Sequence, residues 1–216
     1  MHVKLGKEDI CNIIKKLSAV FKNEKDLLND LDSKIGDGDH GLSMSRGFDA
    51  IDKYLVKRPD LSISDTLIQG GMQFNEVTGS TIGILIFSAM RAAGLAIKDK
   101  ESIDIMDLEF MLEEAVKAIM KRGKASAGQK TMLDSLVPSL EYLKKSEKNN
   151  MKKDEISIVK QMVEKAYKGA KSTKQMESTI GRAKWFKNRS IGVIDPGAYS
   201  SYLIIKTIGD YIIKNN

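Results

Sequence analysis

Three aspartates and a histidine lie among glycines in the segment LDSKIGDGDHG (31–41). At short range the carboxylates of Asp32, Asp37 and Asp39 repel one another, and a fold tolerates them best when a hard cation neutralises their charge. The intervening glycines allow tight turns and a close approach of the backbone to a ligand. The segment therefore predicts a magnesium site beside a phosphate, and the alternative is a set of solvated turn and helix-end residues.

Other familiar metal and nucleotide motifs do not match the sequence. An EF-hand needs a bidentate glutamate at its twelfth position, but that position is Phe48 counted from Asp37 and Ser43 counted from Asp32. The chain has no GxxxxGK[ST] loop, no HExxH pair and no cysteine cluster. Magnesium is then favoured over calcium or zinc, because it takes few protein ligands and completes its shell with phosphate and water.

A helix is predicted to begin directly after the aspartates, at His40, Gly41, Leu42 and Ser43. The first turn of a helix presents free N–H groups and partial positive charge, which suits a polyphosphate that also contacts the metal. We expect His40 to contact phosphate rather than to act as a general base.

Three further turns are candidates for phosphate binding. They are TGSTIG (78–83), the stretch from Gly123 to Met132, and the stretch from Gly181 to Asp195-Pro196-Gly197. Each one alone is typical of an ordinary turn or helix cap.

The elements that carry these motifs are predicted to be helices. Prolines are only three, and apolar residues recur at spacings of three and four, which indicates an all-α chain that forms one domain over residues 1–216. Eight helices are expected, over 8–31, 40–57, 64–77, 81–97, 107–121, 131–143, 155–171 and from after Gly197 to the charged end.

Four local features refine this prediction. The helix over 81–97 is apolar on most sides and should lie deep in the core. Asp107 should cap the next helix, and Pro138 should kink or delay the one over 131–143. Residues 172–194 form a long connection, and long ordered loops are usually functional.

Composition narrows the class of partner. Lysine and arginine outnumber aspartate and glutamate 35 to 29, but the two signs of charge are interleaved along the chain. The clearest basic cluster is the short one around Trp185. A tryptophan in this setting is more typical of packing or of a protein contact than of nucleic-acid binding. The longest apolar stretch, 82–90, is too short to span a membrane, and the N-terminus lacks the apolar segment of a secretory signal. With Cys11 as the single cysteine, we expect a cytoplasmic protein that contacts neither membrane nor nucleic acid.

Taken together and in order, the motifs resemble those of the L subunit, the nucleotide-binding subunit, of bacterial dihydroxyacetone kinases. The resemblance covers nearly the whole chain. It is carried by LDSKIGDGDHGLSMSRGF (31–48), TGSTIG (78–83), RGKASAGQKTMLD (122–134) and GRAKWFKNRSIGVIDPGAYS (181–200). It implies an up-and-down barrel of eight antiparallel helices that holds ADP or ATP through two magnesium ions.

The resemblance also assigns roles to residues of this chain. Asp32, Asp37 and Asp39 match the metal ligands, and Arg182 would spread the charge of the transferring phosphoryl group. The nucleotide contacts it implies are His40, Gly41, Leu42, Ser43, Ser80, Thr81, Gly123, Met132, Arg182, Asp195, Pro196 and Gly197. One departure is Ile82, which stands where the family commonly has a serine, so that Ser80 or Thr81 would have to supply the hydroxyl.

The family resemblance implies half of an enzyme, because the ketose binds covalently to a histidine of a separate K subunit and this chain has only His2 and His40. In one mode, bound ADP is rephosphorylated by a phosphohistidine subunit of the phosphotransferase system, and the ATP formed phosphorylates dihydroxyacetone. In another, ATP exchanges as an ordinary substrate. A separate L chain of this length favours the first mode. A third hypothesis is a nucleotide-loaded regulatory module that contacts a transcriptional regulator.

Overall fold

A computed structural model describes residues 2–148, 154–181, 184–185 and 189–215 of the chain. Its helices are α1 (Lys7–Asn23), α2 (Lys25–Ser33), α3 (His40–Val56), α4 (Ile63–Thr78), α5 (Thr81–Ala96), α6 (Ile105–Gly123), α7 (Leu133–Lys148), α8 (Glu155–Ser172), the short 3-10 turn η1 (Thr173–Gln175) and α9 (Pro196–Asn215). Two short strands, β1 (Leu5–Gly6) and β2 (Ser102–Ile103), pair antiparallel with Leu5 opposite Ile103.

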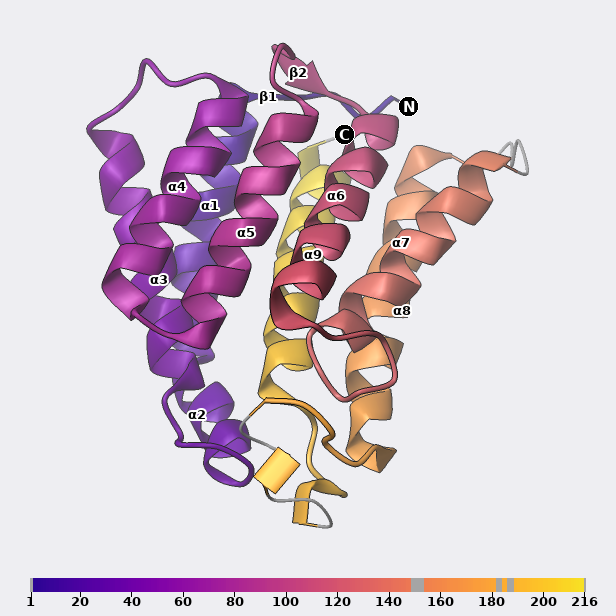
Figure 1. Cartoon of the computed structure of the whole chain (residues 1–216). Coiled ribbons are helices and arrows are strands. Elements are labelled where there is room, and N and C mark those ends of the chain that lie inside the picture. The colour runs from indigo at the N-terminus through magenta and orange to yellow at the C-terminus, as the bar shows by residue number, and fades with distance from the viewer. Residues whose placement is uncertain (1, 149–153, 182–183, 186–188, 216) are drawn as a thin grey trace.

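Helices α1 and α3 to α9 stand side by side and alternate in direction, which confirms the predicted all-α class and its antiparallel arrangement (Figure 1). At one end lie α2 and the segment that leads into α9, and at the other lie β1, β2 and the end of α9. Within the part of the chain that the structure describes, no helix combines the length and hydrophobicity needed to cross a membrane.

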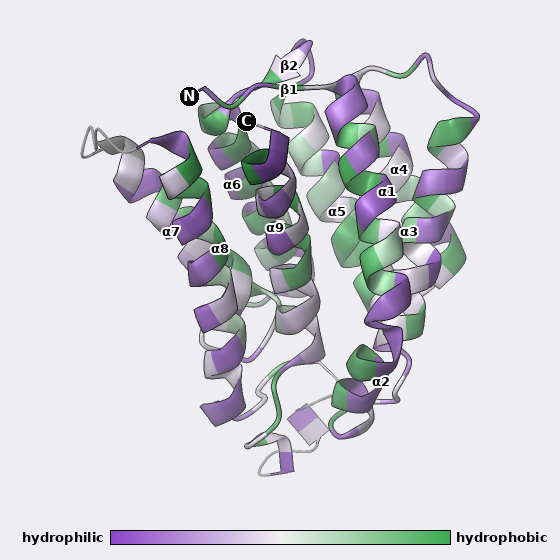
Figure 2. Cartoon of the chain, turned by 180° about the vertical axis from the view of Figure 1, so that it is seen from behind, coloured by the Kyte–Doolittle hydropathy of each residue, from purple (hydrophilic) through white to green (hydrophobic). Residues whose placement is uncertain are grey.

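The helices enclose an apolar interior. A cavity of about 200 Å³ is lined by residues from α1 and from α3 through α9, among them Ile13, Phe48 and Ile205. The prediction that the 81–97 helix lies deep in the core is wrong, since only Gly83, Ile86 and Gly94 of α5 are buried. This helix is a wall of the barrel that packs against α4 and faces the apolar cavity. Its residues are accordingly hydrophobic or neutral along most of its length, which are green or white in Figure 2.

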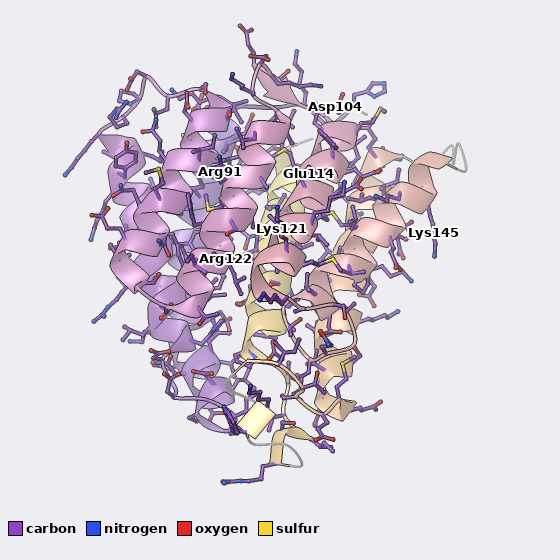
Figure 3. All side chains as sticks on the ribbon, in the orientation of Figure 1. Arg91, Asp104, Glu114, Lys121, Arg122 and Lys145 are labelled. Carbon is purple, nitrogen blue, oxygen red and sulfur yellow. The ribbon has the colours of Figure 1, made fainter. Side chains whose placement is uncertain are left out.

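Most charged side chains occupy the outer faces. Arg91 of α5, Lys121 of α6 and Lys145 of α7 are exposed on the outside of the barrel (Figure 3). Between α6 and α7, Glu113 accepts hydrogen bonds from Lys117 at 2.9 Å and Lys144 at 2.8 Å, and these partners hold the pKa of Glu113 below its usual value. Exposed pairs of this kind contribute little to stability.

Two predicted helix boundaries need correction. The first expected helix is two helices, because the chain bends at Glu24 between α1 and α2, which brings Leu28 into the core. The fifth begins earlier than Asp107, since Asp104 is its N-cap and its Oδ1 accepts from the Asp107 N–H at 2.8 Å. Asp107 instead completes a capping box, with its Oδ2 accepting from the Asp104 N–H at 3.2 Å.

Pro138 lies inside α7 and shapes its contact with α8. Proline has no N–H, so the carbonyl of Asp134, four residues earlier, receives no hydrogen bond from it. That carbonyl faces Gly169 of α8, where an added Cβ would lie 2.0 Å from the Asp134 oxygen. Nearby, Ser135 Oγ donates to the Ala166 carbonyl at 3.1 Å, so the two backbones are held in close contact.

We expect Gly169→Ala to lower the free energy of unfolding by about 1–3 kcal/mol, because the new methyl group would push against backbone that cannot rotate away. Chemical denaturation of both proteins measures the change. Gly6→Ala is the control, since the nearest atom to a Cβ there is 3.8 Å away. An unfolding free energy for Gly169→Ala within about 0.5 kcal/mol of the parent would contradict the close contact.

Candidate functional site

A cavity of about 370 Å³ opens at the end of the barrel where α2 lies. Because helix direction alternates, four helices begin at this end, and a residue from the start of each lines the cavity: His40 of α3, Thr81 of α5, Leu133 of α7 and Pro196 of α9. Each helix start carries partial positive charge and N–H groups without partners within the helix. The cavity is therefore suited to an anion.

The three predicted aspartates meet on one side of this cavity. One carboxylate oxygen from each of Asp32, Asp37 and Asp39 lies within 4.8 Å of the others. Two oxygens bound to one magnesium ion lie about 3 to 4 Å apart, so small side-chain adjustments would bring these oxygens into one coordination shell. The donor set, all carboxylate oxygen, is the one a hard cation prefers.

The backbone around the aspartates is shaped by Asp32 and by glycine. Asp32 Oδ2 accepts from the N–H groups of Asp39 at 3.0 Å and His40 at 3.2 Å, which joins the end of α2 to the start of α3. A Cβ at Gly36 would lie 2.3 Å from Asp32 Oδ1, and Gly38 has a φ of +77°. Both positions require glycine, as the sequence predicted.

His40 lies in the cavity wall with its ring buried. Its Nε2 is 2.9 Å from Ser200 Oγ, and that hydroxyl donates its proton to the Gly197 carbonyl at 3.0 Å. The ring Nε2–H must therefore donate to Ser200, which fixes the tautomer and leaves Nδ1 without a proton. Burial lowers the pKa of His40 to about 4, so the ring is neutral near pH 7. Both N–H groups of His40 are engaged inside the protein, and its predicted phosphate contact stays a prediction.

Asp195 precedes α9 and caps it, with Oδ2 accepting from the Ala198 N–H at 2.7 Å. Its own N–H donates to Thr173 Oγ1 at 3.0 Å, which connects the start of α9 to the end of α8. Burial raises the pKa of the Asp195 carboxyl to about 7, although the Ala198 N–H and the nearby Lys130 act in the opposite direction. This carboxyl is thus close to half-protonated near neutral pH.

The rest of the cavity wall is mostly apolar. Ile82 and Leu85 of α5 line it together with Ile119 of α6, Met132 at the start of α7 and Ile180. Ser80 caps α5, its Oγ accepting from the Gly83 N–H at 3.4 Å. Ile82, the departure from the family pattern, is part of this apolar wall.

Most of the predicted site residues come together. Those that line the cavity are Asp32, Asp37, Asp39, His40, Ser80, Thr81, Gly123, Met132, Asp195, Pro196 and Gly197. Gly41, Leu42 and Ser43 lie in the first turn of α3 but not in the lining, and the N–H of Leu42 donates to Asn29 Oδ1 at 3.1 Å. Arg182 lies outside the described residues.

Sequence reasoning missed several wall residues, among them Leu85, Ile119 and Ile180. In the sequence these are ordinary apolar positions. Nothing in their type distinguishes a side chain that faces the cavity from one that faces the core.

Comparison with known proteins shows the family of this chain. The model of the DAK2 domain family matches residues 34–210 of the chain. The chain belongs to the DAK2 domain family. It is 36% identical over 183 residues to the PEP-dependent dihydroxyacetone kinase 1, ADP-binding subunit DhaL, of Listeria innocua, a match that covers 85% of each chain. It is 32% identical over 207 residues to the corresponding DhaL subunit of Escherichia coli K12, a match that covers 95% of this chain and 97% of that one.

The fold is also found in solved structures. The structure of the dihydroxyacetone kinase from C. freundii in complex with AMP-PNP and Mg²⁺ superposes with a TM-score of 0.70 at 22% identity. The match covers 97% of this DAK2-family chain but 35% of that chain, so this chain spans about a third of the solved structure.

The raised pKa of Asp195 predicts a pH-dependent stability. A carboxyl with a pKa near 3.8 when unfolded and about 7 when folded favours the fold at low pH, and this contribution is lost progressively as pH rises from about 4 to 7. We expect the free energy of unfolding of Asp195→Asn, relative to the parent, to be higher at pH 8 than at pH 4.5 by more than about 1 kcal/mol.

Denaturant unfolding at the two pH values measures this difference. Asp210→Asn is the control, because Asp210 is an exposed partner of Lys206 on the same helix. If the difference between Asp195→Asn and the parent does not change with pH, Asp195 is ionised throughout.

Proposed function

We propose that this chain is the nucleotide-binding phosphotransfer subunit of a dihydroxyacetone kinase. The observation that carries the proposal is the meeting of three carboxylates and four helix N-termini around one cavity. In this proposal the three carboxylates bind magnesium ions, and the helix N-termini bind the phosphates of the nucleotide. The names of the similar proteins, which are ADP-binding subunits, support the same ligand.

The roles of the residues follow from their chemistry. Asp32, Asp37 and Asp39 would hold magnesium, which neutralises charge on the phosphoryl group during transfer. N–H groups at the starts of α5 and α9, beside Ser80, Thr81, Pro196 and Gly197, would bind phosphate oxygens, and the predicted contacts from His40 to Ser43 would add to them. The apolar wall around Ile119 and Met132 would hold the adenine, with Gly123 beside it. Arg182 would stabilise the charge of the transferring group.

The acceptor would bind to another chain. His2 lies far from the cavity, with its ring nitrogen Nδ1 3.0 Å from Glu155 Oε1, and the ring of His40 is engaged with Ser200. Neither is placed to bind a ketose covalently. Dihydroxyacetone would therefore sit on a separate K subunit, and a phosphohistidine subunit of the phosphotransferase system would rephosphorylate ADP that stays bound. The subunit would act in the cytoplasm as one domain.

Two other modes share the same site. In one, ATP exchanges as a substrate of an ATP-dependent ketose kinase. In the other, the nucleotide-loaded chain regulates a partner such as a transcriptional regulator, and phosphotransfer is secondary. The two experiments below separate these modes.

Replacing one aspartate tests the metal site. We expect Asp37→Asn to reduce phosphotransfer to dihydroxyacetone by more than about 100-fold when assayed with the cognate K subunit, because it removes a charged magnesium ligand. Calorimetric titration with Mg-ADP should show a matching loss of affinity. Asp26→Asn is the matched control, since its side chain is 91% exposed at the start of α2. Full phosphotransfer activity in Asp37→Asn would contradict the proposed magnesium site.

The bound nucleotide distinguishes the modes of turnover. We expect near-stoichiometric ADP when the protein is purified without added nucleotide, denatured and its supernatant analysed by chromatography. An empty protein that turns over free ATP with a K subunit would instead indicate exchanging ATP.

A further inference from the structure

Lys130 is buried beside the nucleotide cavity, with 2% of its surface exposed. Its ammonium nitrogen lies within hydrogen-bonding distance of four backbone carbonyls, so that its three N–H groups are shared among them: Thr173 at 2.6 Å, Met176 at 3.1 Å, Ser190 at 2.8 Å and Val193 at 2.6 Å. No carboxylate of the described residues forms an ion pair with it. An ammonium that spends all of its donors on carbonyls has none left for a phosphate.

The four carbonyls come from both ends of the connection between α8 and α9. Thr173 and Met176 belong to its start, and Ser190 and Val193 to its end. Other bonds join the same ends, since the Gly192 N–H donates to the Lys174 carbonyl at 2.7 Å and the Ser178 N–H to Ser190 Oγ at 2.9 Å. The Lys130 ammonium thus lies between the two ends of the connection and binds both.

Three parts of the cavity wall are close in the chain to Lys130 or to the carbonyls that it binds. Thr131 and Met132 follow Lys130 in the chain, Ile180 and Gly181 follow Met176, and Asp195 to Gly197 follow Val193. Each part lies within a few residues of Lys130 or of a carbonyl that it binds. The position of the ammonium thus constrains three separate stretches of the site.

The conformation of Lys130 indicates that its side chain is needed. Its φ is +60°, in the left-handed region that glycine adopts without strain and that other residues adopt at a cost of roughly 1 kcal/mol. Burial disfavours the charged ammonium and lowers the pKa of Lys130. Charge-assisted hydrogen bonds to the carbonyls offset both costs.

We propose that Lys130 is a positioning residue for the nucleotide, one that holds the walls at 131–132, 180–181 and 195–197 in register by binding both ends of the α8–α9 connection. This inference rests on the proposed function for its ligand. It assigns Lys130 no contact with phosphate, in contrast to the usual role of a lysine near a nucleotide.

Lys130→Met tests the proposal, because it keeps most of the length of the unbranched side chain and removes every donor. We expect the Kd for Mg-ADP, measured by calorimetry well below the unfolding temperature, to rise at least tenfold. We also expect amide hydrogen exchange to quicken in peptides that cover 173–181 and 189–195, with the protection of α3 to α6 retained. A purely structural role would lower protection throughout the barrel.

Lys124→Met is the matched control. Lys124 lies in the same loop, also has a positive φ of +49°, and is exposed, so the same change of charge should leave both the affinity and the exchange unchanged. If Lys130→Met does not fold, Lys130→Gln, which keeps two donors, serves in the same comparison with a smaller expected effect.

The outcomes separate this inference from the proposed function. A folded Lys130 variant with the Mg-ADP affinity and exchange pattern of the parent overturns the positioning role. If the parent itself does not bind Mg-ADP, the proposed function fails, while local loss of protection in the variant would still show that Lys130 holds the connection.

Discussion

Short connections make neighbouring helices run in opposite directions, and the site depends on this alternation. In a barrel of this kind every second helix begins at the same end, so α3, α5, α7 and α9 all start around one cavity. Their partial positive charges add where the three aspartates gather. The proposed site for metal and phosphate would follow from topology together with a single acidic loop, without a glycine-rich phosphate loop of the P-loop type.

The charges of the site are divided between groups that face the cavity and groups that hold the walls. The oxygens of Asp32, Asp37 and Asp39 converge within 4.8 Å of one another, and a bound cation would relieve the repulsion between them. The side chains of Lys130 and Asp195 are instead buried and form hydrogen bonds with backbone groups.

The faces and the ends of the helices have different roles. Their inward faces are apolar and enclose the second cavity, whereas their ends supply N–H groups and turns to the site. Ile119 and Met132 line both cavities, so the candidate site and the barrel interior share side chains. Substitutions in the interior that move these two residues would change the shape of the candidate site as well.

The sequence by itself determined most of the helices, because apolar residues recur along them with helical spacing. It also determined the acidic loop, because three carboxylates among glycines within eleven residues are typical of a hard-cation site. The motifs in their order identified the family.

The sequence could not decide that the first helix bends at Glu24, that α5 is a wall rather than a core helix, or that Ile119 lines the cavity beside the aspartates. These features depend on which neighbour each helix face meets. Only the tertiary structure placed Lys130 against four carbonyls 43 to 63 residues away along the chain. Contacts at that separation leave no periodic or local signal in the sequence.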